Sequence, residues 1–233
     1  MRRAHIAIAA VAWTALWSMP ATAEPLIYGI QVEQAERRLD DGSDVYAWDF
    51  DAVAGTDELK VVWRSEAEYV TEGNQFETLE NQLRLQKPIS TFFDAVVGVR
   101  VDTPRGEDRV YGVVGVKGLA PQWFELDADL YVGETSFVRV EAEYEGLITN
   151  RIILTPSVEL DTPLGDDAAL GVGAFGPKLE VGARLSYDLL DRAISPYIGV
   201  HYERLFGETA DLAREVGEQK DNLYMVVGMK MLF

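Results

Sequence analysis

The residues that could do chemistry in this 233-residue chain are carboxylates spaced two apart. Such pairs occur at Glu66 and Glu68, at Glu125 and Asp127, and at Glu141 and Glu143. Alternate residues of a β-strand point to the same face, so each pair places two carboxylates on one side of a strand. Carboxylate oxygens are ligands for hard cations. The spacing therefore predicts a cation-binding face or, as an alternative, a solvated face in which arginines neutralise the acids.

A single imidazole shares this pattern. The chain has two histidines, and only His201 lies outside the amino-terminal segment. In 194–202 the even positions are apolar, so His201 and Glu203 share the polar face of a predicted strand. The two residues are candidate metal ligands together with the acids above. The other interpretation is an ordinary hydrogen-bonded histidine in a polar interior.

Composition excludes several classes of protein. The chain has 39 Asp+Glu against 21 Lys+Arg, a net charge of −18, and no cysteine. A phosphate backbone needs Lys and Arg, so nucleic-acid binding is not expected. Without cysteine there is no disulfide scaffold or thiol nucleophile. No G-x-S-x-G elbow occurs and His201 faces the polar side, so we expect no enzymatic activity.

The elements that must position these residues are strands. Apolar and polar residues alternate in twelve segments, with charges on one face and aliphatic residues on the other: 26–38, 44–53, 58–69, 76–87, 90–102, 109–118, 122–132, 136–146, 150–161, 178–189, 193–205 and 222–233. Connections after even-numbered segments are short, whereas the two longest, 162–177 and 206–221, follow odd-numbered ones. This asymmetry is typical of outer-membrane barrels. We predict an all-β, closed antiparallel up-and-down transmembrane barrel; a secreted β-sandwich or lipocalin-like barrel is the soluble alternative.

The ends of the chain carry targeting features. Arg2 and Arg3, an apolar run and Ala21-Thr22-Ala23 predict a signal peptide over 1–23 and a barrel over 24–233, in the outer membrane of a Gram-negative bacterium. The final Phe233 closes an alternating strand, which predicts recognition by the outer-membrane assembly machinery. The same alternate positions of this strand hold Met225, Met229 and Met231, so we expect these side chains to face lipid with Phe233. Pro156 and Pro196 interrupt strands, where local bulges are expected.

Several stretches resemble the copper resistance protein B family of outer-membrane proteins. The resemblance runs from about residue 26 to the carboxyl end. Its most specific piece is Gly-Leu-Ala-Pro at 118–121 followed by Trp-Phe-Glu at 123–125, and further similar stretches are 28–34, 47–49, 141–144, 150–156 and 207–211.

The resemblance implies an outer-membrane barrel that binds or handles copper at the cell envelope, with periplasmic copper-resistance proteins as possible partners. Family members often carry a Met/His-rich segment before the barrel, whereas here only Glu24 and Pro25 separate the predicted cleavage site from the first strand. The expected copper ligands are then the inward acids and His201, since imidazole suits Cu(II). A generic small barrel, either a weak cation pore or a structural protein, is the alternative.

Overall fold

The alternating segments form one sheet that closes on itself. The computed structural model describes residues 25–39, 44–103, 108–190 and 192–233, so the predicted signal peptide over 1–23 lies outside the described residues. Its strands are β1 (Ile27–Leu39), β2 (Val45–Gly55), β3 (Lys60–Val70), β4 (Gln75–Pro88), β5 (Phe93–Thr103), β6 (Arg109–Ala120), β7 (Phe124–Val132), β8 (Phe137–Tyr144), β9 (Gly146–Leu147), β10 (Ile152–Pro163), β11 (Lys178–Tyr187), β12 (Ile194–Leu205) and β13 (Asp221–Leu232).

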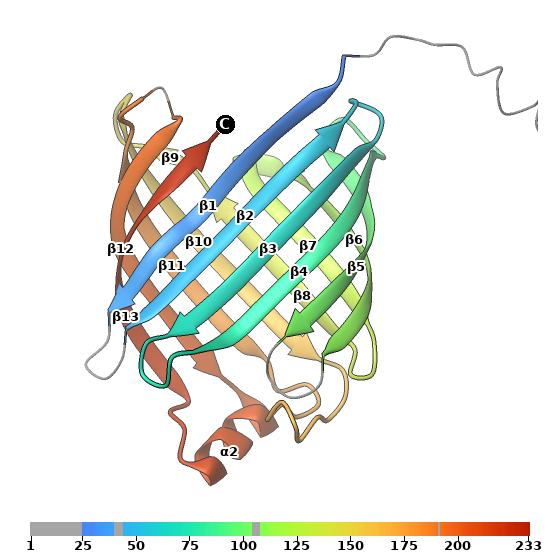
Figure 1. Cartoon of the computed structure of the whole chain (residues 1–233), viewed down its shortest axis with the longest axis vertical. Coiled ribbons are helices and arrows are strands. Elements are labelled where there is room, and N and C mark those ends of the chain that lie inside the picture. The colour runs from blue at the N-terminus through green and yellow to red at the C-terminus, as the bar shows by residue number, and fades with distance from the viewer. Residues whose placement is uncertain (1–24, 40–43, 104–107, 191) are drawn as a thin grey trace, which may run out of the picture.

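Every strand pairs antiparallel with its neighbours, and β13 returns to β1, with Gln31 opposite Leu232 and Leu39 opposite Met225 (Figure 1). The two-residue β9 continues β8 along β10, so the wall is that of a twelve-stranded barrel. The predicted fold class is confirmed. Within the described residues, no helix is long and apolar enough to cross a membrane, a finding that does not bear on strands.

The two ends of the barrel differ. The carboxyl terminus and the start of β1 lie at one end, with short connections such as the 3-10 helix η2 (Pro121–Trp123). The helix α2 (Gly207–Val216) and the segment 164–177 lie at the opposite end. We call this the outer end, because transmembrane barrels have short periplasmic turns and longer outer loops. The prediction of a loop over 206–221 is wrong in part, because the helix α2 occupies most of that segment.

The outer connections support one another. Thr209 of α2 accepts a hydrogen bond from the Gly173 amide (3.0 Å) and donates one to the Gly176 carbonyl (2.7 Å). A Cβ on Gly176 would lie 2.4 Å from Thr209 Oγ1, so a glycine is needed for this close approach. On the far side of the same segment, Asp167 contacts Arg109 and accepts a hydrogen bond from the Thr135 hydroxyl (2.9 Å). The segment 164–177 is thereby fixed to α2 and to the β6–β8 side.

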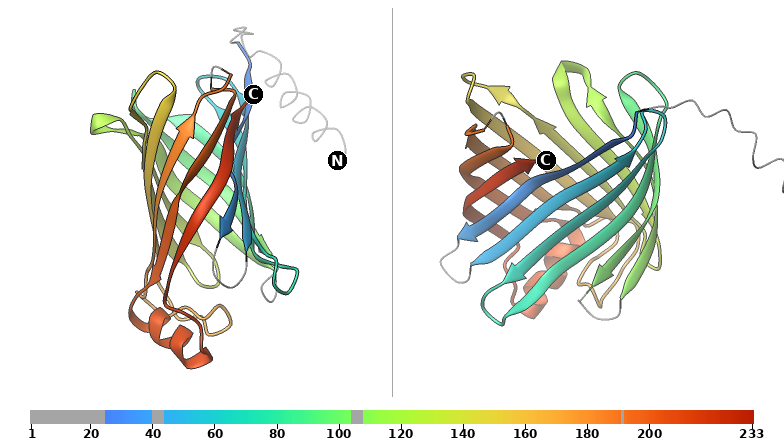
Figure 2. Two further views of the ribbon diagram at one scale, coloured as in Figure 1. Left: turned by 90° about the vertical axis from the view of Figure 1, so that its left-hand side faces the viewer. Right: turned by 45° about the horizontal axis from the view of Figure 1, so that its top comes forward.

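The two faces of the wall have the predicted chemistry. Aliphatic residues such as Val99, Val114 and Met225 are exposed on the outside, while Arg84, Arg184 and Gln82 are almost fully buried inside. This is the reverse of a soluble barrel and suits a lipid-facing surface. The barrel is narrower in the left view of Figure 2 than in Figure 1, so opposite walls approach each other.

The bulges expected at Pro156 and Pro196 are not found. The β8–β9 strand is interrupted at Glu145, but β8 and β9 pair with β10 in the same register, and Pro156 pairs with Ala183 of β11 without a shift. At Pro196 the register likewise continues through the pair Pro196–Met229. The register shifts that do occur lie between Val32 and Ala35 in β1 and after Glu68 in β3.

Candidate functional site

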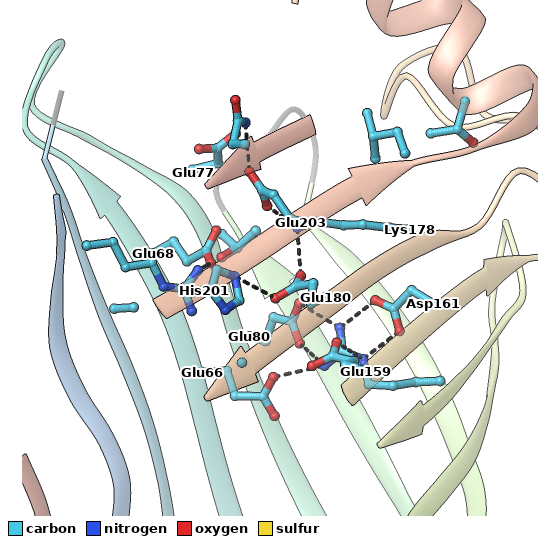
Figure 3. A pocket seen from close by; sticks show the side chains of 18 of the residues that line it. Glu66, Glu68, Glu77, Glu80, Glu159, Asp161, Lys178, Glu180, His201 and Glu203 are labelled. Atoms are coloured by element: carbon cyan, nitrogen blue, oxygen red, sulfur yellow. Dashed lines mark hydrogen bonds and ion pairs between the residues drawn. The ribbon is translucent and has the colours of Figure 1, made fainter. Parts of the chain in front are cut away.

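A cavity of about 1090 Å³ occupies the outer part of the lumen, beneath α2 and the segment 164–177 (Figure 3). Fourteen Asp or Glu residues line it, against five Lys or Arg residues and His201. Most of these acids lie on the inward faces of β3, β4, β8, β10, β11 and β12. An excess of carboxylates within low-dielectric walls attracts cations.

His201 projects into this cavity from β12 with only 5 % of its side chain exposed. In the register it stands opposite Gly182 of β11 and Tyr224 of β13. Ser157 and Arg184 fill the place that a side chain at Gly182 would take. The Nε2 of His201 lies 3.2 Å from Glu180 Oε2, but the geometry makes no hydrogen bond, so this buried nitrogen has no hydrogen-bond partner. Buried polar atoms are rarely left in this state.

Glu203, two residues along β12, is held from three sides. Its Oε1 accepts hydrogen bonds from Asn222 Nδ2 (2.9 Å) and Tyr224 OH (3.0 Å) of β13. Its Oε2 lies 3.2 Å from the Lys178 ammonium, which also lies 2.8 Å from Glu180 Oε1. Lys178 therefore bridges two carboxylates of the cavity wall.

Four other predicted residues line the cavity, each next to a cation. Glu66 lies 2.8 Å from Arg139, Glu68 is bonded to Arg38, Glu141 lies 3.9 Å from Arg64, and Glu143 lies 2.9 Å from Lys230. Three of these pairings join strands that are far apart in the sheet, whereas Glu68 and Arg38 lie on β3 and β1, with only β2 between them. Glu125 and Asp127 do not line the cavity, so six of the eight predicted ligands are brought together around it.

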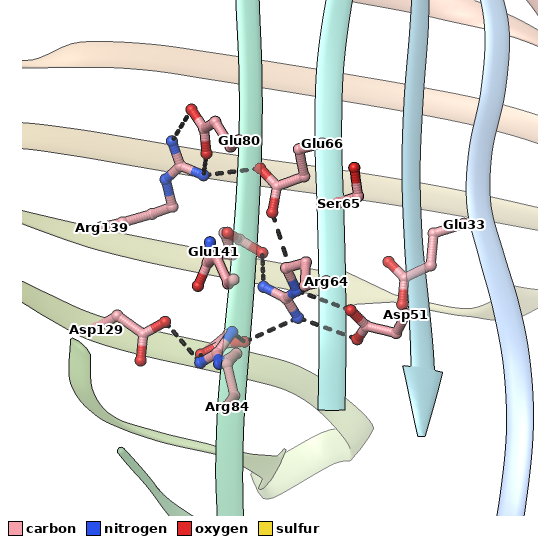
Figure 4. A network of polar contacts seen from close by, with 12 residues as sticks. Glu33, Asp51, Arg64, Ser65, Glu66, Glu80, Arg84, Asp129, Arg139 and Glu141 are labelled. Atoms are coloured by element: carbon pink, nitrogen blue, oxygen red, sulfur yellow. Dashed lines mark hydrogen bonds and ion pairs between the residues drawn. The ribbon is translucent and has the colours of Figure 1, made fainter. Parts of the chain in front are cut away.

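A second network of ion pairs fills the lumen on the periplasmic side of the cavity (Figure 4). Arg64 binds Asp51 (3.0 Å) and Asp127 (3.1 Å). Arg84, with no exposed side-chain surface, lies 3.1 Å from Asp127 and 2.6 Å from Asp129. These contacts connect β2, β3 and β4 to β7. Across β7 and β8, Glu125 stands opposite Glu143 and Asp127 opposite Glu141. The sequence pattern placed these acids on the inward face but missed Arg84, Glu80 and Asp51 as members of the network.

The carboxylates converge on lysine and arginine rather than on one another. Among the residues the structure describes, no group of three or more His, Asp or Glu side chains is arranged to hold a metal ion. The available donor set near His201, one imidazole nitrogen with carboxylate and phenol oxygens, still suits a divalent ion such as Cu(II). A metal ion there has to compete with the cations already inside the barrel.

The comparisons with known proteins agree with the barrel fold and also identify the family. The family model described as Copper resistance protein B precursor (CopB) matches residues 26–233. Copper resistance protein B of Escherichia coli is 32 % identical over 208 residues, covering 88 % of this chain and 69 % of that protein. Copper resistance protein B homolog of Pseudomonas syringae pv. tomato is 34 % identical over 195 residues, covering 83 % of this chain and 65 % of that protein. The chain thus spans about two thirds of the length of these relatives.

Solved structures show the barrel fold at low identity. A chain from a study of the in-meso crystallization of membrane proteins has a TM-score of 0.55 at 12 % identity, covering 89 % of this chain and 83 % of that one. The NanC porin has a TM-score of 0.51 at 12 % identity, covering 88 % of this chain and 98 % of the porin. With its family match over nearly all of the barrel and two relatives above 30 % identity, the chain belongs to the copper resistance protein B family.

Proposed function

We propose that this barrel serves copper resistance by binding copper ions in the outer cavity of its lumen. The observation that carries the proposal is the excess of carboxylates around the buried His201 Nε2. Carboxylates alone favour hard cations, whereas an added imidazole shifts the preference toward Cu(II). We take the metal to be copper because both relatives are named for copper resistance.

Cu(II) fits this cavity better than Cu(I). Cu(I) prefers soft thioether ligands, but Met225 and Met229 lie on the lipid-facing side of β13, with 67 % and 42 % of each residue exposed. Neither lines the cavity. We therefore propose that the barrel takes the oxidised ion through oxygen and nitrogen ligands.

The generic cation pore is the weaker candidate. A pore needs a continuous water-filled path, whereas Arg64, Arg84 and Arg139 join opposite walls within the part of the lumen that the structure describes. The arrangement favours a cation-binding cup that faces outward. Catalysis forms no part of the proposal.

Copper tolerance of a deletion strain tests the proposal first. The strain is complemented with the wild type, with His201→Gln, or with Glu125→Gln, a carboxylate outside the cavity lining. We expect growth in copper to be restored by the wild type and Glu125→Gln and to be reduced with His201→Gln, with no difference in zinc or detergent. Equal tolerance of all strains, including the deletion, would support the generic barrel instead.

Binding to the purified barrel gives the direct measurement. Titration of Cu²⁺ into the detergent-solubilised protein should show saturable binding that His201→Gln weakens by a large factor. A Cu²⁺ affinity unchanged by His201→Gln would remove the imidazole from the site.

Three further roles complete the proposal. Residues 1–23 direct secretion and are cleaved near Ala23, and Phe233, two-thirds exposed, is the signal for the outer-membrane assembly machinery. Periplasmic copper-resistance proteins are the partners that would meet the end with the short turns. Pull-down of such proteins by the wild-type barrel, compared with a variant altered in those turns, tests the last point.

A further inference from the structure

The Lys178 ammonium lies between two carboxylates of the cavity wall. Lys178 begins β11 at the outer end, and its Nζ is 2.8 Å from Glu180 Oε1 and 3.2 Å from Glu203 Oε2 (Figure 3). The two glutamates are directly opposite each other in the β11–β12 register. Like charges at this spacing repel unless a cation lies between them, and here the ammonium supplies that positive charge.

The imidazole adjoins the same carboxylate. Glu180 has one oxygen at Lys178 and the other 3.2 Å from His201 Nε2. That nitrogen is buried, borders the cavity and makes no hydrogen bond. The acidic pair is therefore accompanied by a second observation that points to a ligand, namely a buried imidazole nitrogen that makes no hydrogen bond.

There is room beside the ammonium for an ion. A second cavity, of about 120 Å³, is lined by three glutamates and two cations, together with Val45, Thr78 and Tyr224: Glu68, Glu77, Glu203, Arg38 and Lys178. A water molecule needs only about 10–15 Å³ when space is measured in this way. The Lys178 side chain is 33 % exposed, and its flexible four-carbon stem can carry the charge away from the glutamates.

We propose that Lys178 is a tethered cation that occupies the copper site of the cavity and sets its affinity for Cu²⁺ by competing for Glu180 and Glu203. The inference rests on the proposed function, since it concerns the same cavity. A bound Cu²⁺ would take the two carboxylates and His201 Nε2, which would have to draw together because they are not arranged around a metal ion while Lys178 lies between the glutamates, and the ammonium would move toward the outer mouth. The lysine neutralises the glutamates in the metal-free barrel and keeps copper binding reversible.

The test compares four purified barrels: the wild type, Lys178→Met, Lys178→Arg and His201→Gln. Cu²⁺ dissociation constants are measured by competition with a chelator, and the EPR spectrum of bound Cu²⁺ reports nitrogen coordination. Lys178→Met should bind Cu²⁺ about tenfold or more tightly, the scale expected when a unit positive charge is removed from beside a partly buried cation site. Lys178→Arg keeps the charge and should stay near the wild type.

The outcomes separate this inference from the function on which it rests. If Lys178→Met binds Cu²⁺ as the wild type does or more weakly, while His201→Gln abolishes the nitrogen signal, the tethered cation is refuted and copper binding stands. If no barrel binds Cu²⁺, both ideas fail. Heat-modifiable gel migration checks that each variant is folded; if Lys178→Met does not fold, Lys178→Gln takes its place under the same criterion.

Discussion

Arg139 on β8 reaches across the lumen to β3, where its Nη1 lies 2.8 Å from Glu66 Oε2. Four strands separate β3 from β8 along the shorter way round the sheet, so this pair joins nearly opposite walls. The same guanidinium lies 3.2 Å from Glu80 on β4. Contacts of this kind make the interior of the barrel a cross-linked structure.

The first prediction concerns conductance. Arg139→Ser removes a bond between opposite walls and should raise the single-channel conductance in planar bilayers above that of a poorly conducting wild type. Arg37→Ser, whose side chain is half exposed, is the matched control and should not change it. A wild-type barrel that conducts as well as Arg139→Ser would show that the bridges do not block ions.

The second prediction concerns stability. Arg84 has no exposed side-chain surface and lies between Asp127 and Asp129. Arg84→Met leaves Asp129 buried without its arginine, while Asp127 keeps Arg64, and breaking a buried pair in this way costs about 3–5 kcal/mol. The free energy of unfolding, measured with denaturant in lipid or detergent, should fall by this amount. Arg37→Met, an exposed pair, should lower it by less than about 1 kcal/mol.

The third prediction concerns acid. Hydrogen bonds from Arg109 lower the pKa of Asp167 to about 2, with the Thr135 hydroxyl adding to the effect. Because the pKa of Asp167 is lower in the folded protein than the value of about 4 in the unfolded chain, its ionised carboxylate stabilises the folded contact fully above about pH 4. This contribution is lost as the pH falls through about 2. Pepsin should therefore cut the segment 164–177 readily at pH 2 and poorly at pH 4. Asp167→Asn should be cut at both values, and equal cutting of the wild type at both would contradict the assignment.

The fourth prediction concerns the methionines. Replacing Met225, Met229 and Met231 together by leucine keeps the apolar outer face and removes all three thioethers of β13. Cu²⁺ affinity and copper tolerance should stay at wild-type values. A loss of copper tolerance in this variant, with normal folding, would place a Cu(I) site on the outside of β13.

Strand positions and side-chain directions could be predicted because they depend on a local, two-residue period. The parity that placed His201 and Glu203 inside, and Met225 outside, is confirmed by their burial. The same period places the acids of β7 and β8 on one face, and the register of the two strands sets Glu125 opposite Glu143 and Asp127 opposite Glu141.

Pairings across the lumen could not be predicted in this way. Whether Arg64 reaches Asp127 depends on how the barrel is flattened and on the stagger of strands that are not neighbours. The inward direction of Arg84 could have been predicted, because Arg84 and Glu80 both occupy even-numbered positions of β4 and so share a face. The helix α2 was missed because one short amphipathic stretch between strands was assigned to a loop, although Gly217, with φ 84°, provides a helix end of the usual kind.

Pairing of the first strand with the last has a consequence for the order of assembly. The bonds between Ile30 and Phe233 and the β1–β13 ladder join the two ends of the sequence, so the ring is complete only once the last residue is present. The Arg184–Glu36 pair bridges the same seam. Before closure, the charged face of the sheet is open to water, and its ions are solvated separately. Neutralisation of the charges at this seam therefore depends on closure of the ring.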